Sequence, residues 1–269
     1  MYYIKSNDGT KIAVYDYNPQ GKQTLFLIHG WPLSHQIFEY QINLLTNCGY
    51  RVVAVDLRGF GKSDTPSDGY SYNQMSADIF QVVRQLCLKK FILVGFSMGG
   101  AIALRYMNRY NGFGVCRLIL LSAAAPYFTQ HPGFPYGKTV QEVNDLISLA
   151  ETDRPQLCLN FSKQLFACPH SDAVIDWFRD IALSASGIGT IKCGIALRDE
   201  DGRDDFRCVH VPTYIIHGGK DTIVSSELVE IQHENICGSK LISLPDSGHG
   251  IMYDQLEKFN SILMHCIID

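Results

Sequence analysis

A serine between two glycines is the most chemically informative feature of this 269-residue sequence. Gly95, Ser97 and Gly99 form the pattern G-x-S-x-G, which follows the apolar run Phe91–Val94 and precedes the helical pattern Ala101–Asn108. In a sharp turn from strand to helix, small flanking residues let the backbone bend and lift the serine hydroxyl out of the sheet. The spacing therefore predicts that Ser97 is a nucleophile. The alternative is a glycine-rich turn that carries a passive serine.

A serine hydroxyl attacks a carbonyl only when a base accepts its proton, and that base is usually a histidine. Seven histidines follow Ser97 in the sequence: His131, His170, His210, His217, His233, His249 and His265. His249 comes directly after the predicted strand Lys240–Leu244, at the carboxyl edge where open α/β sheets place their sites. Of the others, two fall in helical patterns, and one follows a strand, where a structural hydrogen bond is the simpler role. We predict that His249 is the base.

The base in turn needs a carboxylate that orients it and stabilises the imidazolium. Asp221 follows the predicted strand Thr213–Ile216 after a glycine turn, so it leaves the sheet at the same edge. Asp246 is a rival, but the three-residue separation from the histidine makes the far ring nitrogen hard to reach. The preceding strand ends in Ser122-Ala-Ala-Ala125 and offers no acid. The prediction is Asp221, and a helix-capping or turn aspartate is its alternative.

Acyl transfer also requires hydrogen-bond donors for the developing oxyanion. The backbone N–H of Met98 lies at the start of the helix after the serine. A second donor is expected from Trp31, in the segment His29-Gly-Trp-Pro32 that follows the apolar run Leu25–Ile28. Trp31 would donate through its main chain, whereas Pro32 has no N–H and should fix the loop.

The elements that must position these groups alternate along the chain. A predicted hairpin, Tyr2–Ile4 with Ile12–Tyr17, precedes short apolar runs typical of strands buried on both faces. These runs are Thr24–Ile28, Val52–Val55, Phe91–Val94, Leu118–Leu121, Thr213–Ile216 and Lys240–Leu244. Helical patterns lie between or after them: Phe38–Asn47, Asn73–Leu86, Ala101–Asn108, Ser226–Asn235 and Leu256–Cys266. The alternation predicts an α/β fold with a doubly wound, mostly parallel sheet.

One interval is too long for a single crossover, since about 90 residues separate the run Leu118–Leu121 from the run Thr213–Ile216. It contains three helical patterns, at Val140–Leu149, Pro155–Phe166 and Ala173–Ser184. We interpret residues 127–207 as a helical cap inserted into a core made of residues 1–126 and 208–269. The charged run Arg198–Arg207 at its end is interpreted as a solvated surface stretch.

Composition narrows the possible partners. There are 23 Lys and Arg against 27 Asp and Glu, for a net charge of −4, which gives no reason to expect nucleic acid or an anionic membrane. The nine cysteines include no C-x-x-C pair and suggest neither a disulfide framework nor a zinc site. The N-terminal segment lacks a secretory pattern, so we expect a cytoplasmic protein.

These motifs resemble the α/β-hydrolase superfamily over almost the whole predicted core. The resemblance rests on His29-Gly-Trp-Pro, Asp56-Leu-Arg-Gly-Phe-Gly-Lys-Ser-Asp64, Gly95-Phe-Ser-Met-Gly-Gly100, Gly218-Gly-Lys-Asp221 and Gly248-His249. Within the superfamily, the sequence is similar to bacterial aryl esterases and non-haem haloperoxidases. That similarity implies an eight-stranded sheet with the cap between strands six and seven, no cofactor or metal, and an oxyanion hole made by Trp31 and Met98. In the peroxidase-like members a proline often follows that tryptophan, as Pro32 does here.

The leading hypothesis is a serine hydrolase that cleaves small carboxylic esters through an acyl-enzyme intermediate. Perhydrolase, thioesterase, C–C hydrolase or lyase chemistry on the same triad remains open, as does a slow-turnover receptor that uses the cap to bind a ligand. Ser97 argues against dehalogenases and epoxide hydrolases, which have aspartate at that position. Residues expected to line the substrate pocket are Pro32, Tyr127, Trp177 and Ile223. The sequence does not determine the oligomeric state, and a homodimer is one of the alternatives.

Overall fold

A twisted eight-stranded sheet forms the centre of the computed structural model, which describes residues 1–268. The strand order is β1-β2-β4-β3-β5-β6-β7-β8. The strands are β1 (Tyr2–Lys5), β2 (Lys11–Tyr17), β3 (Thr24–Ile28), β4 (Arg51–Val55), β5 (Phe91–Phe96), β6 (Val115–Leu121), β7 (Thr213–Gly218) and β8 (Lys240–Leu244). β1 pairs antiparallel with β2, and β2 with β4, whereas all other pairs are parallel. The predicted hairpin and mostly parallel sheet are confirmed.

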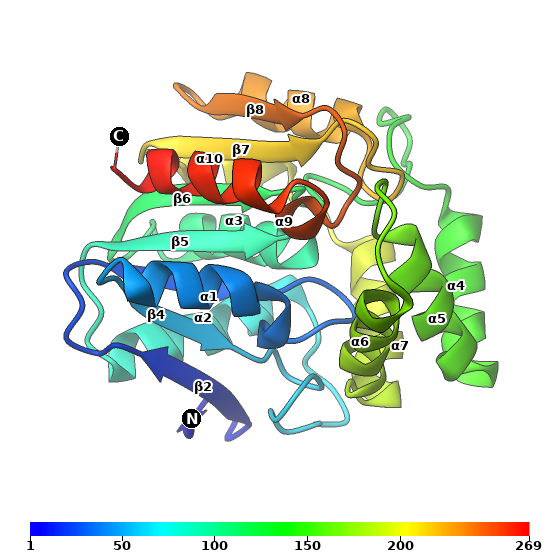
Figure 1. The fold of residues 1–269 in the computed structure, drawn as a ribbon. Helices are drawn as coiled ribbons and strands as arrows, with labels where there is room; N and C mark the ends of the chain where they lie inside the picture. Colours follow the sequence, from blue (N-terminus) through cyan, green and yellow to red (C-terminus); the bar gives the residue numbers. More distant parts are fainter. Residues whose placement is uncertain (269) are drawn as a thin grey trace.

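Helices cover both faces of the sheet, which explains why its central strands are apolar throughout. Figure 1 shows α1 and α10 on the near face, with α2 and α3 behind the sheet. The helices of the core are α1 (Glu39–Asn47, after the 3₁₀ turn His35–Phe38), α2 (Tyr72–Gln85), α3 (Met98–Arg109), α8 (Ser226–Asn235), α9 (Ile251–Asp254) and α10 (Leu256–Ile268). All six residues of β5 are buried.

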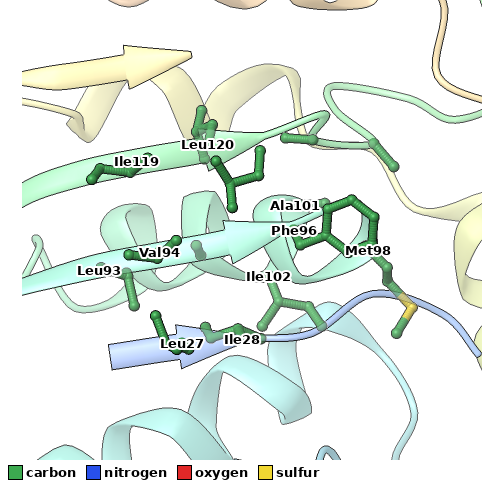
Figure 2. Close-up of a cluster of buried hydrophobic side chains, with 14 of the residues drawn as sticks. Leu27, Ile28, Leu93, Val94, Phe96, Met98, Ala101, Ile102, Ile119 and Leu120 are labelled. Carbon is green, nitrogen blue, oxygen red and sulfur yellow. The ribbon is translucent and has the colours of Figure 1, made fainter. Parts of the chain in front are cut away.

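The core is densest where α3 crosses the central strands. Figure 2 shows Leu27 and Ile28 of β3 beside Leu93 and Val94 of β5, with Ile102 of α3 among them. Each of these side chains is at most 2% exposed. Burial of a branched or aromatic side chain contributes about 2 kcal/mol, so this cluster fixes α3 firmly against the sheet. The turn between β5 and α3 therefore has little freedom.

Four helices lie in the chain between β6 and β7 and gather at the end of the sheet where the parallel strands finish (Figure 1). They are α4 (Val140–Thr152), α5 (Arg154–Gln164), α6 (Asp172–Leu183) and α7 (Gly187–Asp199). Side-chain oxygens of Thr139, Asp153, Ser171 and Ser186 cap their first turns. Such caps define where each helix begins. Within residues 1–268, no single helix has the length and apolar character to cross a membrane; only α6 and α7 together, bent by 93°, meet that test.

Two features of this insertion differ from the sequence-based expectation. Helix α7 was not predicted, because its three glycines weaken the helical pattern, yet Gly189 is needed where the helix packs against the backbone of Gly59. The charged run Arg198–Arg207 is not simply solvated surface. It enters a second 3₁₀ turn (Arg203–Cys208), in which Asp205 is 3% exposed and accepts a hydrogen bond from Arg105 of α3 at 2.8 Å. The ion pair with Arg105 thus allows part of this charged run to be buried.

Candidate active site

Ser97 occupies the turn between β5 and α3, in a backbone conformation that few residues other than glycine adopt. Its φ is +53° and its ψ is −121°. Main-chain hydrogen bonds hold this conformation: Ser97 N–H donates to Leu121 O at 2.9 Å, and Ser97 O accepts from Gly100 at 2.9 Å and Ala124 at 3.0 Å. A side chain on Gly95 would meet Gly99 O at 2.5 Å. The G-x-S-x-G spacing is therefore required by close packing, and the strained turn is held by its surroundings.

The predicted base and acid lie in contact. His249 follows β8 in a short loop, and its Nδ1 is 2.7 Å from Oδ2 of Asp221, which follows β7. The other carboxylate oxygen, Oδ1, accepts N–H groups from Ile223 at 2.8 Å and Val224 at 2.9 Å. Burial alone would raise the pKa of Asp221, but the charge and hydrogen bond of His249 and these N–H groups outweigh it and lower the pKa. An ionised acid fixes the proton of His249 on Nδ1 and leaves Nε2 as an acceptor.

The structure does not hydrogen-bond Ser97 to His249. Nε2 of His249 is buried and has no hydrogen-bond partner among residues 1–268. The two residues are nevertheless close in space, because the ring of Phe96, next to Ser97, lies 4.8 Å from the imidazole, centroid to centroid. Ser97 is 5% exposed and His249 is 1% exposed, so both are enclosed.

The alternative residues are engaged elsewhere. Asp246, the rival acid, is exposed and pairs with Lys220 at 3.2 Å. His217 donates from Nε2 to the carbonyl of Val224 at 2.9 Å, the structural hydrogen bond expected from the sequence, although it also lies 3.6 Å from Asp221. The geometry therefore assigns Asp221 to His249.

The loop after β3 lies directly beside the serine. A Cβ on Gly30 would be 2.8 Å from the Cβ of Ser97, which places the backbone of Trp31 next to the turn that carries Ser97. Neither the main-chain N–H of Trp31 nor that of Met98 donates to another group in the described part of the chain. The indole of Trp31 instead donates to Thr190 O in α7 at 2.8 Å. Two unpaired N–H groups next to a serine suit an oxyanion.

A buried histidine holds this loop in place. His29 donates from Nδ1 to Gly30 O at 2.8 Å and accepts the N–H of Leu57 on Nε2 at 2.9 Å. Both roles require the neutral ring, and burial lowers the pKa of His29 to about 4. His29 is therefore a structural residue of the loop that carries Trp31.

A mostly apolar cavity opens onto Ser97. Apolar side chains from the segments after β3, β6 and β7 and from α4, α5 and α7 line it: Trp31, Phe128, Val143, Leu146, Leu157, Phe161, Leu197 and Ile223. Gly194 completes the wall, and the polar side chains of Lys138, Asn160 and Gln164 also contribute. Asn160 and Gln164 are exposed, so they mark the mouth. Ile223 was predicted as a pocket residue and Trp31 as an oxyanion donor, whereas none of the other side chains in this wall was predicted. Most of these belong to helices, where apolar spacing does not show which partner a side chain meets.

Three residues expected in the pocket do not line this cavity. Pro32 follows Trp31 in the chain and is buried, but it is not among the residues that line the cavity. Tyr127 packs against His131 and Phe134, with ring centroids 4.2 and 5.2 Å apart. Trp177 packs edge-on against Phe178 and Tyr253 at 5.2 and 5.9 Å. Tyr127 thus packs within the segment between β6 and α4, whereas Trp177 joins α6 to α9.

Comparison with known proteins identifies the family. A sequence model described as the alpha/beta hydrolase fold matches residues 23–256. The chain belongs to the α/β-hydrolase family. Within residues 1–268 of this hydrolase, no three His, Cys, Asp or Glu side chains come together as ligands for a metal ion.

Relatives of this α/β hydrolase cover its whole length. An AB hydrolase superfamily protein of Bacillus subtilis is 46% identical over 97% of both chains. The solved structure of an esterase from Exiguobacterium antarcticum is 45% identical in sequence, covers 99% of both chains and has a TM-score of 0.96. A bromoperoxidase from Bacillus anthracis is 34% identical, with coverage of 100% and 99% and a TM-score of 0.94. Residues 127–207 are included in these matches, so the similarity extends beyond the motifs around Ser97, Asp221 and His249.

Proposed function

We propose that this α/β hydrolase cleaves carboxylic esters, with Ser97 as nucleophile, His249 as base and Asp221 as orienting acid. One observation carries the proposal: His249 is bound to Asp221 through Nδ1, and its Nε2 is unpartnered beside the strained turn that bears Ser97. The similarity to an esterase over the full chain supports the same reaction class.

The reaction follows from these positions. When substrate binds, the Ser97 hydroxyl comes within hydrogen-bond reach of Nε2, a contact that often forms only in the complex. Nε2 takes the hydroxyl proton as the oxygen attacks the ester carbonyl, and the N–H groups of Trp31 and Met98 stabilise the oxyanion. The imidazolium then protonates the leaving alcohol. Nε2 then takes a proton from a water molecule as the water oxygen attacks the acyl-enzyme. The imidazolium gives this proton to the oxygen of Ser97 as the acid is released.

Residues 127–207 are the cap in this proposal, and they supply most of the substrate-binding surface. Side chains of α4, α5 and α7 complete a wall to which the core contributes Trp31, Ser97 and Ile223. An apolar cavity favours an ester with a hydrocarbon group inside it, while Lys138, Asn160 and Gln164 accommodate a polar end at the mouth.

The test is a series of p-nitrophenyl esters of increasing acyl length, assayed with wild type and Ser97→Ala. We expect a clear optimum in kcat/KM at one chain length, and a loss of about 10⁴-fold or more in Ser97→Ala with the fold intact. A fluorophosphonate should label Ser97 in wild type. Ser97→Ala with wild-type turnover, or a failure of the reagent to react, would contradict the proposal.

Perhydrolysis is a second candidate, because the chain resembles a bromoperoxidase and carries Pro32 directly after Trp31. The carbonyl before the proline could accept a hydrogen bond from hydrogen peroxide, which would replace water at the acyl-enzyme. The measurement is the rate of peracid formation from acetate and hydrogen peroxide in wild type and Pro32→Leu, normalised to ester hydrolysis. A lower ratio in the variant is expected; equal ratios remove this role of Pro32.

A further inference from the structure

A buried carboxylate outside the proposed triad lies five residues after His249. Asp254 ends α9, and its side chain is 0% exposed. Oδ2 accepts the N–H groups of Gly248 at 2.7 Å and Ala167 at 2.9 Å. Oδ1 accepts the N–H of Cys168 at 3.2 Å and lies 2.9 Å from Nε2 of His170. Hydrogen bonds to an ionised acceptor are stronger than neutral ones, so four donors on one carboxylate make a firm junction.

The donors come from two segments that are far apart in the sequence. Gly248 belongs to the loop of residues 247–250 that carries His249, called here the base loop. The other three belong to residues 165–170, called here the cap linker, which joins α5 to α6. A further bond joins the same two segments, since Gly250 N–H donates to Leu165 O at 2.7 Å. Gly248 is thus held to the cap linker through Asp254, and Gly250 is held to it directly, so both neighbours of His249 are fixed.

The contact between these segments leaves no spare room. A Cβ on Gly248 would lie 2.9 Å from both Ala167 N and Leu165 O. On the other side, a Cβ on Gly250 would lie 2.7 Å from the ring of Phe166. The base loop therefore follows the position of the cap linker closely.

The cap linker begins where a wall of the cavity ends. Helix α5 contributes Leu157, Asn160, Phe161 and Gln164 to the Ser97 cavity, and Leu165 is the next residue. Whatever occupies the cavity contacts the helix whose end is hydrogen-bonded to the base loop. Asp254 and His170 contribute most to this junction, and neither of them lines the cavity.

We propose that Asp254 is a positioning residue for His249, and that it couples the base to the cap through His170 and the cap linker. This inference rests on the proposed function, because it requires His249 to be the base. An imidazole displaced by about 1 Å from its productive position can lose about 100-fold in rate, which is the effect that the junction prevents.

The main variant is Asp254→Asn. Every group that faces the carboxylate is a donor, so the new NH₂ must oppose at least one N–H of Gly248, Ala167 or Cys168. We expect kcat for the best p-nitrophenyl ester to fall about 10- to 100-fold with KM changed much less. The low-field proton resonance of the His249–Asp221 hydrogen bond should shift or broaden.

Asp78→Asn is the matched control. Asp78 in α2 is an equally buried carboxylate, 1% exposed. It pairs with Arg58 and contacts neither the base loop nor the cap linker. The Asp78→Asn variant should lose stability while it retains the wild-type kcat and the wild-type proton resonance of the His249–Asp221 hydrogen bond. This control separates a general loss of stability from displacement of His249.

Variants of His170 test the proposal in case Asp254→Asn does not fold. The side chain of His170 lies in the cap linker and is 16% exposed, so its replacement should disturb the fold less. His170→Ala should lower kcat about 3- to 10-fold, by a fraction of the loss expected for Asp254→Asn. His170→Gln, whose amide can still donate to Asp254, should restore most of it.

The outcomes separate the two proposals when fluorophosphonate labelling is measured alongside turnover. If wild type is not labelled at Ser97, the proposed function fails. If wild type is labelled and Asp254→Asn retains wild-type kcat, labelling rate and proton resonance, the inference about Asp254 is overturned and the proposed function stands. Wild-type kcat in His170→Ala would overturn the coupling to the cap.

Discussion

Residues 96–98 form the turn that carries Ser97, called here the nucleophile turn. This turn and the base loop both deliver a proposed catalytic side chain to the same edge of the sheet, but different parts of the molecule hold them. Ser97 is fixed by main-chain hydrogen bonds to neighbouring core residues, and the glycines around it meet the backbone of β3 and α3. His249 is fixed on one side by Asp221, from the core, and on the other by Asp254 and the cap linker.

The difference indicates where the site can respond to substrate. The nucleophile turn can move only if the central sheet moves, because α3 is packed into the core cluster of Figure 2. The base loop is hydrogen-bonded to Leu165, the residue that follows α5, so we expect it to move with α5. We therefore expect changes in the cap to alter proton transfer by His249 more than the position of Ser97.

The largest effect is expected from a change on the base side that leaves the nucleophile turn untouched. In Asp221→Asn, the amide oxygen stays with the N–H groups of Ile223 and Val224, so the NH₂ faces His249. The imidazole must then accept on Nδ1 and carry its proton on Nε2, where it cannot take the proton of Ser97. We expect kcat to fall about 10³- to 10⁴-fold, with circular dichroism unchanged. Activity within about tenfold of wild type would refute this role of Asp221.

Matched glycine variants sharpen the comparison further. A Cβ in Gly99→Ala would lie 2.4 Å from the carbonyl oxygens of Ile28 and His29, which are core backbone. The Gly248→Ala clash is with the cap linker, which can shift. We expect Gly99→Ala to lose about 3 kcal/mol or more of stability, and Gly248→Ala to fold normally with kcat about tenfold lower.

Urea unfolding and steady-state kinetics on the same preparations provide the measurement. Equal losses of stability in the two variants, or full activity in Gly248→Ala, would show that the two regions are held in the same way.

The smallest effect concerns pH. The folded pKa of His29 is about 4, below its ordinary 6.5, so the unfolded chain binds this proton first as pH falls. Stability from His29 is complete above the ordinary pKa and is lost between the two values, by about 2 kcal/mol from pH 7 to pH 5. Asp221 behaves differently: its lowered pKa contributes stability that is lost only in more acidic solution. Urea unfolding of wild type and His29→Gln over this range should show a shallower pH dependence in the variant; identical slopes would contradict the assignment.

Core and cap also differ in how far the sequence predicts them. All eight strands were predicted, because each is an apolar run between turn residues, and the spacing around Ser97, Asp221 and His249 depends on local backbone geometry. The cavity was not predicted beyond Ile223. Its wall depends on how α4, α5 and α7 pack together, and no local pattern distinguishes Phe161, which lines it, from Trp177, which does not.

Asp254 was missed for a similar reason. Three of its four partners, the N–H groups of Ala167 and Cys168 and the side chain of His170, lie more than 80 residues earlier in the chain and leave no signal beside it in the sequence.

The central claim is that Ser97 carries the acyl group during turnover, and trapping that intermediate tests it most directly. Wild-type protein is mixed with excess p-nitrophenyl acetate, quenched in acid within the first turnovers, digested and analysed by mass spectrometry. We predict a mass increase of one acetyl group on the peptide that contains Ser97, absent in Ser97→Ala and accumulating in step with an initial burst of p-nitrophenol. Hydrolysis at the wild-type rate with no acetyl group on Ser97, or with the group on another residue, would contradict the account.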